Sequence, residues 1–293
     1  MNRIRVLLLA ALALTATFAL AEGRKYAVLV GVSAYKDPGS TNLVTFPQLQ
    51  YAHLDAQRLS TRLKELGWTV IEKTSEPGGK DEAGKASILG TLKSLVTTSE
   101  DTFLFFYSGN GCESAGTGYL ACSDSVLQAP TDSRPGRPMA DSMLSLGEVG
   151  QALTTMSTKK RILLLDISRK DRPMVMPDGS GPTAMRGDLV AEIARMGRSG
   201  PTSWCLLSSC DRGEESFEAP DLMGGKGGGV FTSALLDALS APQSRDNAGR
   251  IRPDLCFDTV VTQVTTWCLA NGRKMTPRWQ ADMMEPLDFG TVK

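Results

Sequence analysis

Two stretches of the sequence run from apolar residues into small polar side chains of types that can take part in catalysis. FLFFYSGNG, at residues 103–111, places Asn110 between two glycines, and RILLLDISRK, at 161–170, ends with Asp166, Ser168 and Lys170. A serine hydroxyl becomes a nucleophile only when a base lies within hydrogen-bond reach. Lys170 stands in a polar loop with acidic neighbours and should stay protonated, and an asparagine amide exchanges no proton near neutral pH. The two stretches therefore predict a serine without an effective base.

The chain has a single histidine, His53, which lies in a stretch with helical spacing between Ala52 and Leu54. We expect it to be a packing or surface residue. Its stretch is far in sequence from the polar strand ends, and a general base must reach the proton that it abstracts. The sequence contains no CxxC pair or histidine cluster with the spacing of a zinc site. It thus predicts neither a metal nor another cofactor.

Part of a phosphate-binding pattern occurs in GGKDEAGKAS, at residues 78–87. Gly79, Gly84 and Lys85 fit GxxxxGK[ST], but Ala86 stands where the pattern needs a hydroxyl to bind magnesium. A polar turn that leads into a helix explains the same residues. We therefore expect no nucleotide binding here.

The first 21 residues have the three parts of a secretory signal: Arg3 and Arg5, an apolar run over 6–20, and small residues at Ala19 and Ala21. We expect cleavage after Ala21 and export to the periplasm or the extracellular space. The alternative is an uncleaved anchor, but a bilayer span needs about 20 apolar residues. No later stretch is apolar enough to span a membrane, so we expect the mature chain not to be attached to a membrane. Lysine plus arginine and aspartate plus glutamate balance at 32 each, which argues against a nucleic-acid partner.

Six cysteines in an exported chain make disulfides an expectation. Cys112 and Cys122 flank a glycine-rich turn, ESAGTGYLA, and we predict that they form a disulfide across it. The close pair at 205 and 210 lies in one expected strand at odd spacing, so its members face opposite sides. The pair at 256 and 268 lies on one expected helix about 18 Å apart. Neither of these pairs can bond internally.

Short apolar runs alternate with amphipathic helical patterns, which is typical of a mostly parallel α/β sheet. Strands are predicted at 26–35, 68–73, 102–108, 161–167 and 202–209. A helix is predicted at 49–66 with Gly67 as its stop, and further helices at 86–97, 146–156, 188–196, 230–239 and 254–270. Three Gly/Pro-rich stretches, at 123–143, 169–187 and 211–229, are expected to wall a cleft near one edge of the sheet.

Taken in their order along the chain, segments of this sequence resemble the caspase and metacaspase family of C14-type peptidases. The resemblance covers nearly the whole mature chain. YSGNG is similar to the family's YSGHG, LLLDISRK to LLLDACRN, and LLSSCDRGEESFE to ASCxxGExSxE. Further similar segments are KYAVLVGVSAY, the helix with Leu54-Asp55-Ala56, GYLACSD, GGVFTSALLDAL and Thr276-Pro277. The resemblance implies an α/β, caspase-like fold with a mostly parallel central sheet and helices on both faces. It also implies a large-subunit-like part at about 24–172, a linker-like loop at about 169–188 and a small-subunit-like part at about 200–293.

The resemblance also implies where the site would be. Asn110 stands where the family has its catalytic histidine, and Ser168 stands where it has its catalytic cysteine. Arg212 lies roughly where a second acidic residue of the site is expected. The positions implied for substrate binding are Asp166, Ser209, Asp211 and Arg212.

These observations predict an exported caspase-fold pseudopeptidase, without a cofactor, that binds a peptide or protein in a vestigial active-site cleft. The thiolate that attacks the peptide carbonyl in the family is replaced by a serine, and the histidine that handles protons is replaced by an amide. One alternative is an active C14-like endopeptidase that uses Ser168 or an unrecognised base. Another is a regulatory or structural partner that does not use the cleft. The sequence gives no prediction of the oligomeric state.

Overall fold

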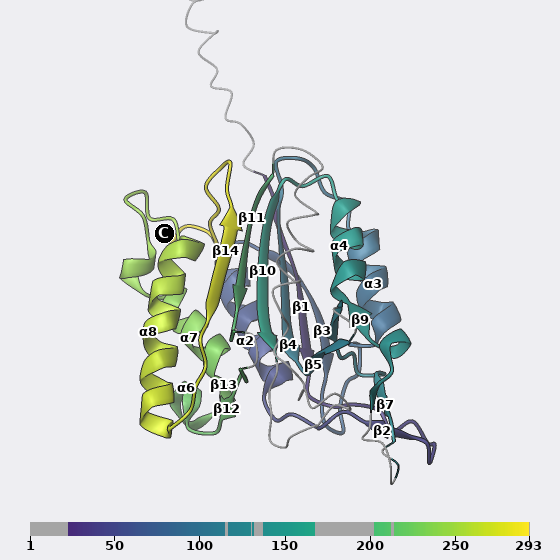
Figure 1. The fold of residues 1–293 in the computed structure, drawn as a ribbon. Coiled ribbons are helices and arrows are strands. Elements are labelled where there is room, and N and C mark those ends of the chain that lie inside the picture. Colours follow the sequence, from purple (N-terminus) through teal and green to yellow (C-terminus); the bar gives the residue numbers. More distant parts are fainter. Residues whose placement is uncertain are drawn as a thin grey trace, which may run out of the picture.

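The computed structural model describes residues 23–114, 117–129, 131, 137–167, 202–211 and 214–292. At its centre is a six-stranded sheet with the order β14-β11-β10-β4-β1-β3 (Figure 1). The five parallel strands are β1 (Lys25–Val32), β3 (Thr69–Ser75), β4 (Thr102–Gly109), β10 (Lys160–Ile167) and β11 (Ser203–Ser208). They confirm the five predicted strands. The sixth strand, β14 (Arg278–Asp282), runs antiparallel to β11 at the edge of the sheet and was not predicted.

Helices cover both faces of this sheet (Figure 1). The helices on one face are α3 (Lys85–Ser94) and α4 (Leu146–Thr154), and those on the other are α2 (Ala52–Glu65), α7 (Val230–Ala238) and α8 (Pro253–Asn271). All five were predicted. Local signals set their ends. Ser145 and Glu148 form a capping box at the start of α4, and Gly272 ends α8 in the left-handed conformation.

The period of two along each strand divides the core into two layers. On β4, for example, Phe103 and Phe105 pack with α3 and α4, whereas Leu104 and Phe106 pack with α2, α7 and α8. All four side chains are fully buried. Because both faces are covered, the strand reads in the sequence as one continuous apolar run. The predicted α/β architecture with helices on both faces is confirmed.

Short elements lie among the segments that join the main strands. They are β2 (Leu43–Thr45), β7 (Val126–Gln128), β8 (Arg137–Pro138), β5 (Gly111–Ser114), β6 (Thr117–Leu120), β9 (Leu144–Ser145), β12 (Glu218–Ala219), β13 (Gly228–Gly229), α6 (Leu222–Gly225), η1 (Ala140–Ser142) and η3 (Pro242–Ser244). Parts of the Gly/Pro-rich stretches at 123–143 and 211–229 therefore have regular structure. The stretch at 169–187, the predicted helix at 188–196 and the predicted signal at 1–21 lie outside the described residues. None of the helices that are described has the length and apolar character of a membrane span.

The turn that resembles a phosphate loop leads into α3, as predicted. A carboxylate of the protein itself lies at the start of this helix, where the Lys85 N–H donates to Asp124 Oδ1 at 2.9 Å. The Lys85 ammonium lies 3.0 Å from Glu148 Oε1 and donates to the Asp141 carbonyl. Acidic groups are favourable at a helix N-terminus. The backbone N–H and the lysine that a phosphate would use thus have partners within the fold.

Candidate functional site

The carboxyl ends of β4 and β10 are neighbours, and the chain leaves both at the same edge of the sheet. The two strands are parallel, and their register pairs Gly109 with Ile167. Asn110 and Ser168 are therefore the next residues of two adjacent strand ends. Ser168 itself lies outside the described residues. The two strands that would bring Asn110 and Ser168 together are thus adjacent and in register as far as the end of β10.

Asn110 is buried, and hydrogen bonds hold both its backbone and the nitrogen of its side chain. Its Nδ2 donates to the Pro47 carbonyl at 2.8 Å, and its backbone N–H donates to Tyr35 Oη at 3.0 Å. Its own carbonyl accepts from Tyr107 Oη at 2.6 Å and from the Ala121 N–H at 2.9 Å. The loop therefore fixes an amide rigidly at the strand end. An amide in this place can orient a neighbour, but it cannot carry a proton between groups.

Two buried tyrosines support this loop. Burial raises the pKa of Tyr107 well above its usual value, and it does the same for Tyr35, so both hydroxyls stay neutral hydrogen-bonding groups. Tyr107 Oη also lies 2.8 Å from the Ala121 carbonyl, so its single hydrogen is shared between this oxygen and the Asn110 carbonyl. A Cβ on Gly109 would lie 2.5 Å from Tyr107 Oη, which explains why glycine precedes Asn110. The tyrosines and Pro47 were not among the predicted site residues, although the apolar run in the sequence contains Tyr107.

Asp166, the predicted substrate-binding residue on β10, has partners within the fold. Its side chain is fully buried. Its Oδ1 accepts from Ser216 Oγ and its Oδ2 from Thr232 Oγ1, both at 2.6 Å. Ser216 follows β11 and Thr232 is in α7. This carboxylate therefore joins β10 to the segment after β11 and to α7, and its role in substrate binding stays a prediction.

The other predicted binding residues follow β11. Ser209 is buried and joins the ends of two strands, because its Oγ accepts from the Ile167 N–H at 3.2 Å and donates to the Ile167 carbonyl at 3.3 Å. Asp211 forms an ion pair with Arg278, the first residue of β14. Their side chains are 37% and 58% exposed, so this pair is open to a ligand. Arg212 lies outside the described residues.

Glu214 anchors the segment after β11 and was not predicted as a site residue. Its carboxylate accepts from the Thr276 N–H at 2.7 Å and from Thr276 Oγ1 at 2.9 Å, and it lies 3.0 Å from Lys274 Nζ. Burial alone would raise the pKa of Glu214, but the bonds from Lys274 and Thr276 lower it below its usual value. The resemblance does include the two segments that meet here, GEES and Thr276-Pro277. The structure brings these two segments into contact.

His53 lies at the start of α2, and its ring has a partner close to β1. Its Nδ1 is 2.7 Å from Ser33 Oγ, which also accepts the His53 backbone N–H. Burial lowers the pKa of the half-buried imidazole. Ser33 is fully buried, so this pair offers no exposed nucleophile. Among the described residues there is also no cluster of His, Cys, Asp and Glu that could hold a metal ion.

The structure contradicts the predicted disulfide between Cys112 and Cys122, because both residues are buried thiols. The register of the β5–β6 hairpin gives the reason. It pairs Cys112 with Tyr119, and Cys122 follows the end of β6. Cys112 Sγ instead lies 3.6 Å from Met143 Sδ. The turn in the sequence was identified correctly, but the two cysteines are offset along it.

All six cysteines are expected to react as thiols, and only after unfolding. Burial raises the pKa of Cys122, Cys210 and Cys256 to about 12. The reactive form is the thiolate, so at pH 8 these groups should be alkylated roughly 10³-fold more slowly than an ordinary thiol. Intact-mass measurement after alkylation of unfolded, unreduced protein should show an adduct on each of the six. A mass with only four adducts would reinstate a disulfide.

Comparisons with known proteins agree with this architecture. The family model described as caspase domain, Peptidase C14, matches residues 24–285. The chain is similar to a crystal structure of protein GSU0716 from Geobacter sulfurreducens, with 14% identity, a TM-score of 0.55, and 92% of this chain and 100% of that chain covered. It is also similar to caspase-1 from Spodoptera frugiperda, with 15% identity, a TM-score of 0.53, and 92% and 91% covered. No curated protein matches. Since the family model spans most of the sequence, the chain belongs to the caspase-domain family, Peptidase C14.

Proposed function

We propose that this protein is an exported caspase-fold pseudopeptidase, which binds a peptide or protein at the carboxyl edge of its central sheet without cleaving it. The observation that carries the proposal is the environment of Asn110. This amide occupies the position of the family's catalytic histidine, and its nitrogen donates to the Pro47 carbonyl at 2.8 Å. The loop holds a group that recognises and orients, at a place where cleavage would need a group that accepts a proton.

The chemistry of the two substituted positions supports binding rather than turnover. A peptidase needs an activated nucleophile and a proton carrier. A serine has replaced the cysteine at 168, and an amide has replaced the histidine at 110. General acid–base help alone is typically worth about 10² to 10⁴ in rate. Both substitutions remove groups that the reaction needs, whereas β4 and β10, the strands that lead to these two positions, belong to the caspase-like fold.

Charged groups at the same edge support a peptide or protein as the ligand. Asp211 and Arg278 are exposed and oppositely charged, and they lie where β11 ends and β14 begins. An exposed ion pair contributes little to folding stability. Asp211 and Arg278 can therefore give up their mutual contact and bind charged groups of a ligand at a low cost in free energy. A peptide supplies such groups together with backbone donors and acceptors. The proposal that the protein is exported rests on the signal pattern at residues 1–21.

The test is selection of peptides from a pooled library on the mature protein, purified from the exported fraction and checked by mass to begin at Glu22. Selected peptides are then measured against Asp211→Ala and Arg278→Ala. We expect at least one of the two to weaken binding by about fivefold, as for loss of one exposed charge contact. Asp258→Ala is the matched control, because Asp258 is an exposed residue on α8.

The outcomes separate the proposal from its alternatives. Selected peptides that bind both variants and the control equally would favour a partner that does not use this edge. A library without any binder would contradict peptide binding. Exported material that still begins at Met1 would contradict cleavage of the signal and with it this part of the proposal.

A further inference from the structure

The side chain of Asn110 is held through its nitrogen, which donates to the Pro47 carbonyl at 2.8 Å. Among the described residues, none donates a hydrogen bond to its oxygen Oδ1, and this atom is also not one of the fully buried polar atoms that lack a partner. Oδ1 therefore keeps contact with solvent, although the residue as a whole is only 7% exposed. The side chain thus presents one hydrogen-bond acceptor to a ligand.

The segment that holds the nitrogen of Asn110 is itself fixed in place. Phe46 is buried, and its ring lies 5.5 Å from that of Tyr35. The Gln48 side chain accepts from the Tyr35 N–H at 2.9 Å and donates to the Tyr35 carbonyl at 3.1 Å. With nitrogen and oxygen exchanged, the Asn110 amide would place two acceptor oxygens together at Pro47, so this network sets its orientation. The acceptor Oδ1 is oriented before any ligand binds.

The Asn110 acceptor lies at the same edge of the sheet as the exposed ion pair of Asp211. The register aligns Tyr107 of β4 with Leu165 of β10, and Leu165 with Ser208 of β11. Asn110 follows Tyr107 by three residues, as Asp211 follows Ser208. Two strand spacings are about 10 Å, which is the length of about three residues of an extended peptide. A peptide that crosses the strand ends can therefore reach both groups.

The chemistry of an amide oxygen restricts the group that it can bind. The oxygen only accepts hydrogen bonds, so the ligand must supply a donor. An uncharged acceptor in a largely buried place compensates poorly for the water that an ammonium group loses on burial. An uncharged N–H fits better. The backbone of a peptide carries one such donor on every residue except proline, and asparagine and glutamine side chains carry others.

We propose that Asn110 Oδ1 accepts a hydrogen bond from an uncharged amide N–H of the peptide that binds at the strand ends. The residue then selects and positions the ligand at the place where the family has its catalytic histidine. This inference rests on the proposed function, because it names a contact within the same site. The donor is an amide N–H, from either the backbone or a side chain of the peptide.

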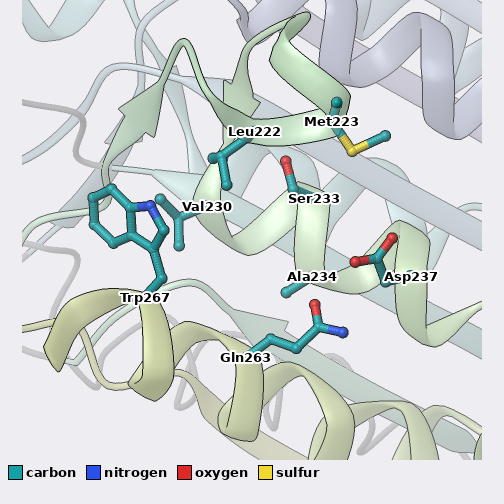
Figure 2. Close-up of a pocket in the computed structure, with 9 residues that line it drawn as sticks. Leu222, Met223, Val230, Ser233, Ala234, Asp237, Gln263 and Trp267 are labelled. Carbon is teal, nitrogen blue, oxygen red and sulfur yellow. The ribbon is translucent and has the colours of Figure 1, made fainter. Parts of the chain in front are cut away.

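A pocket in the helical layer offers a different place for a peptide, and it provides a control. It lies between α6, α7 and α8 (Figure 2). The Gln263 amide of α8 lines it, across from Asp237 of α7. Asn110 is not part of this lining. A peptide at the strand ends should therefore not contact Gln263, whereas a peptide in the pocket should.

The test uses a hexapeptide selected from the pooled library on the mature protein. In one series of analogues, each backbone N–H is replaced singly by an ester oxygen, which keeps the shape of the chain. In a second series, each side-chain donor is replaced by an apolar counterpart, including norleucine for lysine. We expect one replacement to weaken binding, measured by calorimetry, by about fivefold or more, as for loss of one hydrogen bond. The series that contains it identifies the source of the N–H.

Three variants connect that replacement to Asn110. Asn110→Leu keeps the branched shape without an acceptor, so the same replacement should then cost less than about twofold. Asn110→Asp keeps an acceptor oxygen and should keep the sensitivity. Gln263→Leu, the matched control from the pocket, should behave like the unsubstituted protein. Denaturant unfolding of each variant shows whether it is folded.

The outcomes separate this inference from the proposed function. Affinity that survives every single replacement would overturn the inference on the unsubstituted protein alone. A replacement that costs as much in folded Asn110→Leu would also overturn it, and so would a lysine ammonium as the coupled donor. In these three cases the peptide still binds, so the proposed function stands. A library without any binder would contradict the proposed function and this inference together.

Discussion

Asp166→Ala should lower the free energy of unfolding by about 2–5 kcal/mol, because it leaves two buried hydroxyl donors without their acceptor. Ser216 Oγ and Thr232 Oγ1 each donate to this carboxylate at 2.6 Å, and the residue is fully buried. The loss is a large fraction of the 5–15 kcal/mol that typically separates folded from unfolded protein. It can be measured by denaturant unfolding of the mature chain.

Two matched variants identify the cause. Asp166→Asn keeps the shape of the side chain and one acceptor oxygen, so it should cost about 1–3 kcal/mol. Asp258→Ala removes an exposed carboxylate from α8 and should stay within about 0.5 kcal/mol of the unsubstituted protein. A free energy of unfolding for Asp166→Ala within that same margin would contradict the structural role assigned here. Such a result would favour the sequence-based expectation that Asp166 binds a ligand.

The position of Asp166 explains why such a group is buried at all. Asp166 belongs to β10, and its two partners lie 50 and 66 residues further along the chain, after β11 and in α7. Asp55 makes a second connection of this kind, because its carboxylate accepts from the Gly229 N–H at 3.1 Å just before α7. Buried carboxylates with several donors fix the relative position of elements that are far apart in sequence. The end of β10, which pairs with the end of β4 beside Asn110, is thus fixed by contacts with the segments after β11 and in α7.

Much of the fold could be predicted from the sequence because its strands are buried on both faces. The run from Phe103 to Tyr107, for example, is not interrupted by a charged residue. The strand predicted there, at 102–108, agrees with β4 to within one residue. Helix α8 ends at Gly272 and α2 ends just before Gly67, and both glycines have a positive φ. These signals are local, so they can be recognised in a single sequence without knowledge of contacts between distant residues.

The features that sequence reasoning missed depend on contacts over long distances. The strand β14 has the short polar sequence RWQAD and becomes a strand only by pairing with β11. The offset of Cys112 from Cys122 depends on the register of a hairpin, which a turn sequence does not specify by itself. Glu214 meets Thr276 across 62 residues. Asp166 was recognised as important from its position two residues before Ser168, but its partners are 50 and 66 residues away.

Absence of peptidase activity is the second large expected effect. Compared with a family member that has its thiolate and imidazole, the mature protein should lack at least the 10² to 10⁴ that general acid–base catalysis typically contributes, in addition to the contribution of an activated nucleophile. The rigid hydrogen bonds of Asn110 give no route by which this amide could act as the base. The hydroxyl of Ser168 should therefore make no difference to the rate.

The most direct measurement of the central claim is hydrolysis of a pooled peptide library by the mature protein, followed by mass spectrometry, alongside Ser168→Ala. The account predicts no cleavage above the protein-free control, and the same result for both proteins. Clear cleavage by the unsubstituted protein that disappears in Ser168→Ala would contradict it and would identify a serine peptidase on this fold.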